Sequence, residues 1–188
     1  MAGVYTVLFL CTGNSARSVL AEALLNHWGR GRFQAFSAGS HPKGAVHPLA
    51  LAELSGAGLS TAGLRSKSWD EFARPGAPLL RLVITVCDQA AAEACPLWPA
   101  APLTSHWGLA DPADPELSEA ERPAAFRTAY RVLEQRIHRL VSLPHDLWPS
   151  DAGPSDALPS DASSPARLKQ ELDRIGRDEA RPHRKPDR

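Results

Sequence analysis

The stretch CTGNSARS, residues 11–18, places a cysteine six residues before an arginine, with small and polar residues between them. An apolar run precedes Cys11 and a segment with helical periodicity follows Arg17, so the loop joins a strand to a helix. In such a loop, successive backbone N–H groups can converge on one point, and the helix N-terminus adds positive potential there. The spacing therefore predicts a cradle for a tetrahedral anion with a thiol at its base.

The residue types of this loop suit that chemistry. Arg17 supplies a permanently charged fork that can bind two oxygens of an oxyanion. Gly13 allows close approach of the backbone, and Asn14 tolerates a left-handed conformation. The positive surroundings favour the thiolate form of Cys11, which is the nucleophilic form. The other loop residues expected around the anion are Thr12, Ser15 and Ala16.

Two further cysteines and an Asp-Pro pair could take part in the same chemistry. Cys87 ends the apolar run LRLVITV as Cys11 ends the first run, and in a parallel sheet both lie at the carboxyl edge, where ligands bind. Free cysteines such as Cys87 and Cys95 are also commonly small buried side chains, and the Asp-Pro pair at Asp111 is common in ordinary turns. Paired with the loop, both features favour catalysis, with Asp114 as a competing candidate for the acid.

The elements that must position these residues alternate between strand and helix patterns. The runs at 4–11 and 79–87 are rich in valine and leucine with little alternation, as expected of strands buried on both faces of a parallel sheet. This order predicts an α/β fold, a doubly wound parallel four-stranded sheet with helices on both faces. The full set comprises strands at 4–11, 33–39, 79–87 and 103–109, helices at 18–29, 47–58 and 121–143, and a helical turn at 68–73.

Length and composition fit one α/β domain with a substantial core, since the chain has 188 residues of which 43% are apolar. Its 21 basic and 21 acidic residues balance, so nothing indicates a nucleic-acid partner or an anionic membrane surface. Residues 1–11 lack a basic segment and are too short to span a membrane. We therefore expect a cytoplasmic monomer with reduced cysteines.

The composition changes after the last predicted helix. Three copies of Pro-Ser-Asp-Ala are followed by a net basic, highly charged segment. Because such a composition cannot bury a core, we expect a catalytic domain at 1–143 and a flexible linker with a charged tail at 144–188. A frayed helix around 166–180 is the most structure expected there, and removal of 150–188 is expected to leave fold and activity largely intact.

The stretch CTGNSARS with the later Asp-Pro pair resembles the low-molecular-weight tyrosine phosphatase family and the arsenate reductases that share its fold. SAGSHPKG, VITVCDQAAAEACP and HWGLADPAD resemble the arsenate reductase branch, and the resemblance covers residues 4–141. It implies that Cys11 is the nucleophile and that residues 12–17 bind the arsenate, with phosphate or sulfate as analogues. It also implies that Ser18 donates a hydrogen bond to the thiolate and that Asp111 protonates the leaving oxygen.

The resemblance implies a redox role for the other two cysteines. Cys11 would attack arsenate, Cys87 would attack Cys11 with release of arsenite, and Cys95 would then attack Cys87. Thioredoxin would reduce the resulting Cys87–Cys95 disulfide, with glutaredoxin and glutathione, or another small thiol, as the alternative reductants. No tightly bound cofactor is required. Some relatives bind a potassium ion near the loop, and the equivalent residues here are Asn14, Glu22, Ser37 and Asp70.

Disulfide geometry restricts the segment between Cys87 and Cys95. One regular helix would separate their Cα atoms by about 12 Å along its axis, whereas a disulfide allows at most about 7 Å. The sequence QAAAEA is nevertheless a good helix former. We therefore predict a marginal helix, bounded by Asp88 and Pro96, that unwinds when the disulfide forms.

Two departures from the families bear on the activity. Many arsenate reductases of this type carry a further cysteine where this chain has Ala16, which the three-cysteine relay does not need. Tyrosine phosphatases usually carry an aromatic residue after the Asp-Pro pair, and Ala113 in its place suits a small oxyanion better than phosphotyrosine. A tyrosine phosphatase is one alternative function. A non-catalytic oxyanion-binding or redox-sensing protein is the other, and intact Cys11, Arg17 and Asp111 argue against it.

Overall fold

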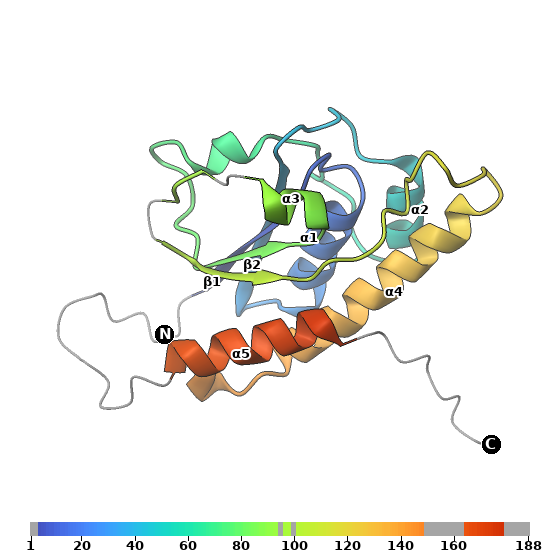
Figure 1. Cartoon of the computed structure of the whole chain (residues 1–188). Coiled ribbons are helices and arrows are strands. Elements are labelled where there is room, and N and C mark those ends of the chain that lie inside the picture. The colour runs from blue at the N-terminus through green and yellow to red at the C-terminus, as the bar shows by residue number, and fades with distance from the viewer. Residues whose placement is uncertain (1–3, 94–95, 99–100, 149–163, 179–188) are drawn as a thin grey trace, which may run out of the picture.

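A computed structural model of the chain describes residues 4–93, 96–98, 101–148 and 164–178. Its strands form one parallel sheet in the order β2-β1-β3-β4 (Figure 1), which confirms the predicted α/β sheet. The strands are β1 (Tyr5–Cys11), β2 (Phe33–Gly39), β3 (Leu82–Thr85) and β4 (Leu103–His106). The helices are α1 (Arg17–Trp28), α2 (Pro48–Gly56), η1 (Trp69–Phe72), α3 (Asp88–Ala92), α4 (Arg122–Val141), η2 (His145–Leu147) and α5 (Ser164–Arg177).

The central strand β1 is buried on both faces, as its apolar run predicts. Val7 and Phe9 face one core cluster, while Leu8 and Leu10 face the other. Parallel pairing with β2 on one side and β3 on the other places Cys11 at the carboxyl edge of the sheet. The nucleophile candidate is thus held at the end of a buried strand that is paired on both sides.

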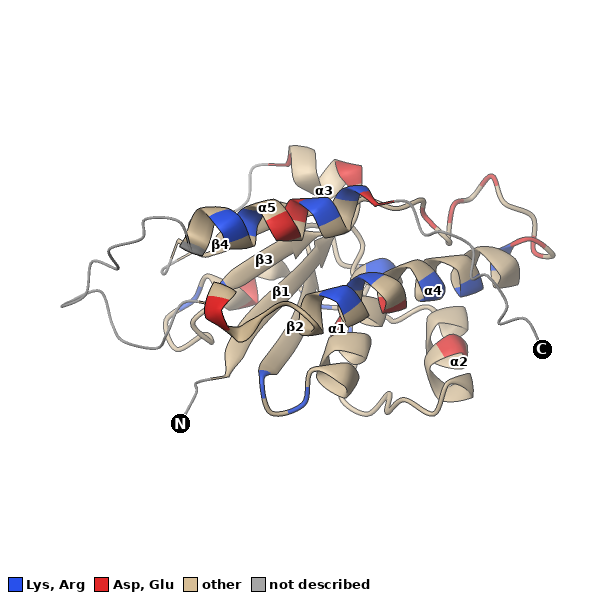
Figure 2. Ribbon diagram, turned by 90° about the horizontal axis from the view of Figure 1, so that it is seen from below, with Lys and Arg blue, Asp and Glu red and all other residues tan. Residues whose placement is uncertain are grey.

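Helical elements cover the two faces of the sheet. Buried residues of α1, α4 and α5 pack into the core cluster on one face, and Figures 1 and 2 show α5 lying beside α4 and β4. On the other face, Phe72 of η1 packs with Leu80 and Val83. Within the described ranges, no helix is both long and apolar enough to cross a membrane.

Two strands are shorter than predicted. β3 begins at Leu82 rather than at Leu79, whose side chain is 60% exposed, and it pairs with Val7–Leu10 of β1. β4 ends at His106, and the next residue, Trp107, is completely buried in the core. The residues beyond these strand ends therefore form loops at the edges of the sheet.

The C-terminal segment contradicts the prediction of a flexible tail at 144–188. Residues 164–177 form the helix α5, in which Leu168, Leu172 and Ile175 are buried in the same core as α1 and α4. These three residues recur at helical spacing, and charged residues occupy other positions of the same helix (Figure 2). The helix is therefore amphipathic, with its apolar face toward the core. Trp148, before the repeats, is also buried. The repeats themselves, at 149–163, lie outside the described residues.

Helix α5 is hydrogen-bonded to the chain that leaves β4. The Trp107 indole N–H donates to the Leu172 carbonyl at 2.9 Å. The buried Arg136 of α4 donates to the Trp107 carbonyl at 2.8 Å and to the Gly176 carbonyl at 2.9 Å. Together, α4 and α5 fix the backbone that leads to Asp111.

Candidate active site

The loop between β1 and α1 turns its carbonyl groups outward. Backbone N–H groups of the segment 41–47 donate to the carbonyls of Thr12, Gly13 and Ser15 at 2.8 to 2.9 Å. Because the C=O and N–H of a trans peptide point in opposite directions, the N–H group that follows each of these carbonyls points into the loop. The loop can therefore present several donors to one anion.

The sulfur of Cys11 lies at the base of this loop, and the residue is 3% exposed. The backbone N–H of Asn14, a residue with a left-handed φ of 39°, donates to the Cys11 sulfur at 3.2 Å. The Ser18 hydroxyl lies 3.0 Å from the same sulfur. Close approach of β2 supports the loop, because a Cβ at Gly39 would lie 2.4 Å from the Thr12 carbonyl oxygen. These donors stabilise a negatively charged sulfur.

The orientation of the Asn14 side chain is set by its partners. The backbone N–H of Lys67 donates to Asn14 Oδ1 at 2.7 Å, which identifies the other amide atom as the donor. That amide nitrogen donates to the hydroxyls of Ser18, at 2.9 Å, and Ser37, at 2.8 Å. Each hydroxyl accepts from Asn14 and keeps its own proton for a further acceptor.

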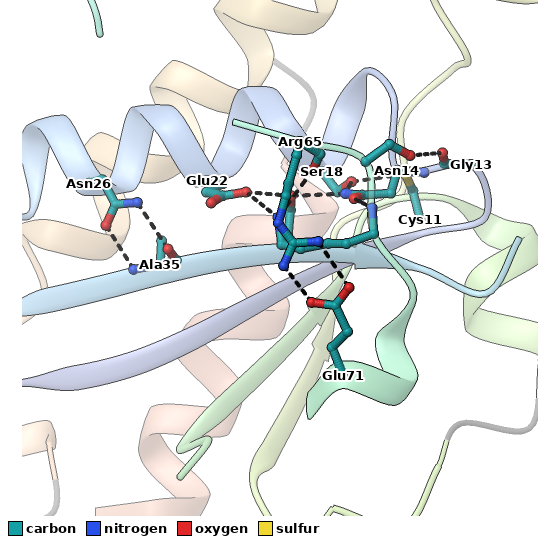
Figure 3. A network of polar contacts seen from close by, with 12 residues as sticks. Cys11, Gly13, Asn14, Ser18, Glu22, Asn26, Ala35, Arg65 and Glu71 are labelled. Carbon is teal, nitrogen blue, oxygen red and sulfur yellow. Dashed lines mark hydrogen bonds and ion pairs between the residues drawn. The ribbon is translucent and has the colours of Figure 1, made fainter. Parts of the chain in front are cut away.

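The hydroxyls of Ser18 and Ser37 face different acceptors, Cys11 and Glu22. The Ser18 hydroxyl accepts from Asn14, so its own proton can be donated to the Cys11 thiolate, which lies 3.0 Å away. Ser37 donates to the Glu22 carboxylate at 2.5 Å. Figure 3 shows this network behind Cys11, with Asn14, Ser18 and Glu22 labelled. The reactive sulfur is thereby connected to a buried carboxylate.

The predicted potassium ligands are only partly brought together. Asn14, Glu22 and Ser37 form one hydrogen-bonded group, but Asp70 is exposed and accepts from the Ser68 hydroxyl at 3.1 Å. The Lys67 ammonium lies 3.4 Å from the Glu22 carboxylate and supplies the positive charge there. Within the described part of the chain, no His, Cys, Asp and Glu cluster could hold a metal. Three of the four expected ligands thus lie together, and Asp70 lies apart from them.

Arg17 and Asp111 meet at the carboxyl edge of the sheet. Arg17 Nη2 lies 2.9 Å from Asp111 Oδ2, and Arg17 Nη1 donates to the Leu109 carbonyl at 3.1 Å. Asp114, the competing candidate, accepts a backbone N–H in the following turn at 2.9 Å. The ion pair brings Asp111 to the arginine of the loop, so the geometry favours Asp111 as the acid.

Cys87 lies at the same edge and is 2% exposed. Its sulfur caps α3 by accepting the Ala90 N–H at 3.4 Å, and the Thr12 hydroxyl lies 3.7 Å from that sulfur. Cys87 therefore borders the loop that holds Cys11. In the described part of the chain both cysteines are free thiols.

Helix α3 begins at Asp88, as predicted, but ends at Ala92 instead of continuing to Pro96. The backbone of Glu93 is extended, with φ −77° and ψ 148°, which ends the helix after five residues. Cys95 lies outside the described residues. Only a short helix would have to unwind for Cys87 to change partners.

Sequence reasoning missed two buried charged residues of the site region, Lys67 and Arg136. Lys67 stands between two serines in RSKS, a pattern typical of an exposed loop. Arg136 lies in the apolar face of α4, one residue before the buried Ile137, and this position was the available signal. An arginine in an otherwise apolar helix face indicates a buried carbonyl or carboxylate partner.

The sequence of this chain is similar to those of known proteins. Residues 6–147 match the model of the low molecular weight phosphotyrosine protein phosphatase family. An arsenate reductase of Bacillus licheniformis is 35% identical over 134 residues, which cover 71% of this chain and 93% of that protein. The match to the family model ends before α5 begins.

Solved structures give the same result. A thioredoxin-dependent arsenate reductase of Corynebacterium glutamicum superposes with a TM-score of 0.55 at 28% identity, covering 73% of this chain and 60% of that one. An arsenate reductase of Archaeoglobus fulgidus superposes with a TM-score of 0.56 at 29% identity, covering 72% of this chain and 98% of that one.

Proposed function

Since the chain belongs to the low molecular weight phosphotyrosine protein phosphatase family, as an arsenate reductase of that fold, we propose that Cys11, Cys87 and Cys95 reduce arsenate to arsenite in a relay. The observation that carries the relay is the position of Cys87. A phosphatase of this fold needs one cysteine, and here a second buried thiol borders the oxyanion loop through Thr12.

In the first step, the inward N–H groups of the loop and Arg17 bind arsenate, and the Cys11 thiolate attacks the arsenic atom. A sulfur–arsenic bond forms, an arsenic–oxygen bond breaks, and Asp111 protonates the departing oxygen so that it leaves as water. Arg17 pairs with Asp111 in the structure, so the bound oxyanion competes with this carboxylate for the guanidinium group.

In the second step, the Cys87 thiolate attacks the sulfur of Cys11. The sulfur–arsenic bond breaks, its electron pair reduces arsenic from the pentavalent to the trivalent state, and arsenite leaves. Cys95 then attacks Cys87, which frees Cys11 and forms the Cys87–Cys95 disulfide. Thioredoxin reduces this disulfide and supplies the two electrons that the arsenic received.

The structure of α3 is compatible with this exchange. Besides packing, α3 is held at its start by the cap that the Cys87 sulfur makes and by a hydrogen bond between Asp88 Oδ1 and His106 Nε2 at 3.1 Å. A five-residue helix has little stability of its own. A change of partner at Cys87 removes the cap, so disulfide formation and unwinding of α3 are linked.

The relay predicts distinct defects for two serine variants. Cys87→Ser should form the arsenic adduct but no intramolecular disulfide, whereas Cys95→Ser should release one equivalent of arsenite and trap Cys11–Cys87. Both variants should keep hydrolysis of an aryl phosphate, which needs Cys11, the loop with Arg17 and the acid Asp111 but neither Cys87 nor Cys95. Peptide mapping after a single turnover, with free thiols alkylated, distinguishes the states.

The same variants test the reductant in an assay coupled to NADPH oxidation. Wild-type turnover is expected with thioredoxin and its reductase, and less with glutaredoxin and glutathione. Full thioredoxin-dependent turnover by Cys95→Ser would show that an external thiol attacks Cys11 or Cys87 directly. The cytoplasmic location and the monomeric state stay predictions from the sequence.

Phosphatase activity is a second function that this site supports, because Cys11, Arg17 and Asp111 suffice for it. We expect Asp111→Asn to lower aryl phosphate hydrolysis by about 10²- to 10⁴-fold, the usual contribution of a general acid. Alkylation of Cys11 by iodoacetamide should persist, because the donors to its sulfur are unchanged. An Asp114→Asn variant is the matched control, and equal losses in both variants would remove Asp111 from the acid role.

A further inference from the structure

We propose that the ammonium group of Lys67 is the resident cation of the polar network behind Cys11, so that this enzyme works without a potassium ion there. Lys67 is then a positioning residue that acts through Glu22 and Asn14. A test by rates of arsenate reduction rests on the proposed function, whereas a test by thermal unfolding of Lys67 and Glu22 variants does not.

Lys67 is held at three points. Its backbone N–H donates to Asn14 Oδ1 at 2.7 Å, and its carbonyl accepts the Gly39 N–H at 2.9 Å. Its ammonium group donates to Glu22 Oε2 at 3.4 Å and to the Arg65 carbonyl at 3.2 Å. The side chain is only 6% exposed, so the charge is buried beside its partner.

Glu22 requires a positive charge at this place. Its carboxylate accepts the proton of Ser37, and its side chain is 11% exposed. Burial raises the pKa of Glu22, while the charge of Lys67, the Ser37 hydroxyl and Arg65 oppose that rise. A buried carboxylate without a cation would take up a proton or draw in water.

The neighbouring arginine does not take over this role. The guanidinium of Arg65 makes two hydrogen bonds to the Glu71 carboxylate, at 2.9 and 2.5 Å (Figure 3). Its charge is engaged by a partner on η1, whereas the ammonium of Lys67 contacts Glu22 directly. Lys67 therefore supplies the charge that compensates Glu22.

Among the residues that the structure describes, the four expected ligands also provide no set of oxygens for potassium. Asn14 Oδ1, the amide oxygen of the expected site, accepts the backbone N–H of Lys67. Asp70 is bonded to Ser68 instead of to the network. A hard cation needs several oxygen ligands, and the remaining carboxylate already faces an ammonium group of the same charge as potassium.

The charge of Lys67 affects the catalytic cysteine by fixing the directions of the hydrogen bonds between Glu22 and Asn14. While Glu22 is ionised it accepts from Ser37, and Ser37 in turn accepts from Asn14. The hydrogen bond from the Asn14 amide to Ser37 and the one from the Lys67 N–H to Asn14 Oδ1 hold Asn14 in its left-handed conformation. Asn14 then places both its backbone N–H on Cys11 and its amide on Ser18.

The test compares initial rates of arsenate reduction in choline chloride, potassium chloride and ammonium chloride at equal ionic strength. Wild-type rates should agree within about twofold, while Lys67→Ala in choline chloride should lose about 10- to 100-fold, as when an orienting partner is removed. Ammonium or potassium ions should restore several-fold of that loss. Lys169→Ala, which removes a lysine paired with Asp173 on α5, is the matched control and should match wild type in all three salts.

Stimulation of the wild type by potassium would overturn the proposal, as would a Lys67→Ala variant that is fully active in choline chloride.

If Lys67→Ala does not fold, thermal unfolding of Lys67→Met, Glu22→Gln and the double variant replaces the rate assay. The double variant should be more stable than Lys67→Met alone, because the unpaired carboxylate is gone. Additive losses would count against the proposal. If the wild type failed to reduce arsenate, the same salts would be compared on aryl phosphate hydrolysis, which separates the two failures.

Discussion

Cys11→Ser is expected to abolish arsenate reduction and aryl phosphate hydrolysis together, each by at least about 10⁴-fold, as for the removal of an enzyme nucleophile. Both reactions begin with attack by the same sulfur. A serine hydroxyl is not ionised near neutral pH, and the donors that stabilise a charged sulfur cannot activate it sufficiently. Steady-state assays of both reactions measure the loss.

Thermal unfolding provides the control for this variant. Serine is slightly smaller than cysteine, and the Asn14 N–H and the Ser18 hydroxyl can still bond to its oxygen. The melting temperature should therefore change little, and phosphate should still raise it by binding to the loop. If either activity survived in a folded Cys11→Ser variant, the two reactions would not share this nucleophile.

Ending the chain after Trp148 is expected to destabilise the fold by several kcal/mol. Burial of each of Leu168, Leu172 and Ile175 contributes about 1.5–3 kcal/mol. Part of this is offset by the conformational entropy that the freed residues regain. The remaining loss is a large part of the roughly 5–15 kcal/mol by which a domain is stable. We expect the melting temperature to fall by at least about 10 °C, which differential scanning calorimetry measures.

Activity should fall with stability in this truncated chain, because Trp107 and Arg136 lose their partners on α5 and the backbone before Asp111 is released. The matched control ends after Asp178, which keeps the whole of α5 and the ion pair of Asp178 with Arg139. It should melt within a few degrees of the full chain. If a chain ending at Trp148 kept the melting temperature and the turnover of the full chain, α5 would not contribute to the stability of the core.

The sequence predicted best what is encoded locally. β2 has the predicted bounds, β1 begins one residue later than predicted, and α1 begins and ends one residue earlier, because an apolar pattern marks each of them. The oxyanion loop is one contiguous stretch, so its residue types and spacing were sufficient. A frayed helix was predicted around 166–180, but the burial of α5 in the core was missed because the composition of the segment outweighed a visible signal, the helical spacing of Leu168, Leu172 and Ile175.

The network behind the loop was not predictable in the same way. Asn14, Glu22, Ser37 and Lys67 come from separate parts of the chain, and only the folded backbone shows which of them touch. The resemblance supplied three of these residues as potassium ligands but not Lys67. The lysine's role depends on a distance of 3.4 Å to Glu22, and no pattern in the sequence encodes that distance.

The position of α5 after the sheet in the sequence affects how the protein is made. Synthesis runs from the N-terminus, so the sheet strands and the oxyanion loop leave the ribosome before the helix that completes the core. The hydrogen bond from Trp107 to Leu172 spans 65 residues, and contacts so distant in sequence form late in folding. A growing chain that has reached Trp148 exposes the apolar surface that α5 later covers, and such surfaces promote aggregation. The backbone before Asp111 therefore reaches its final form only after α5 has been synthesised, although it precedes α5 in the sequence.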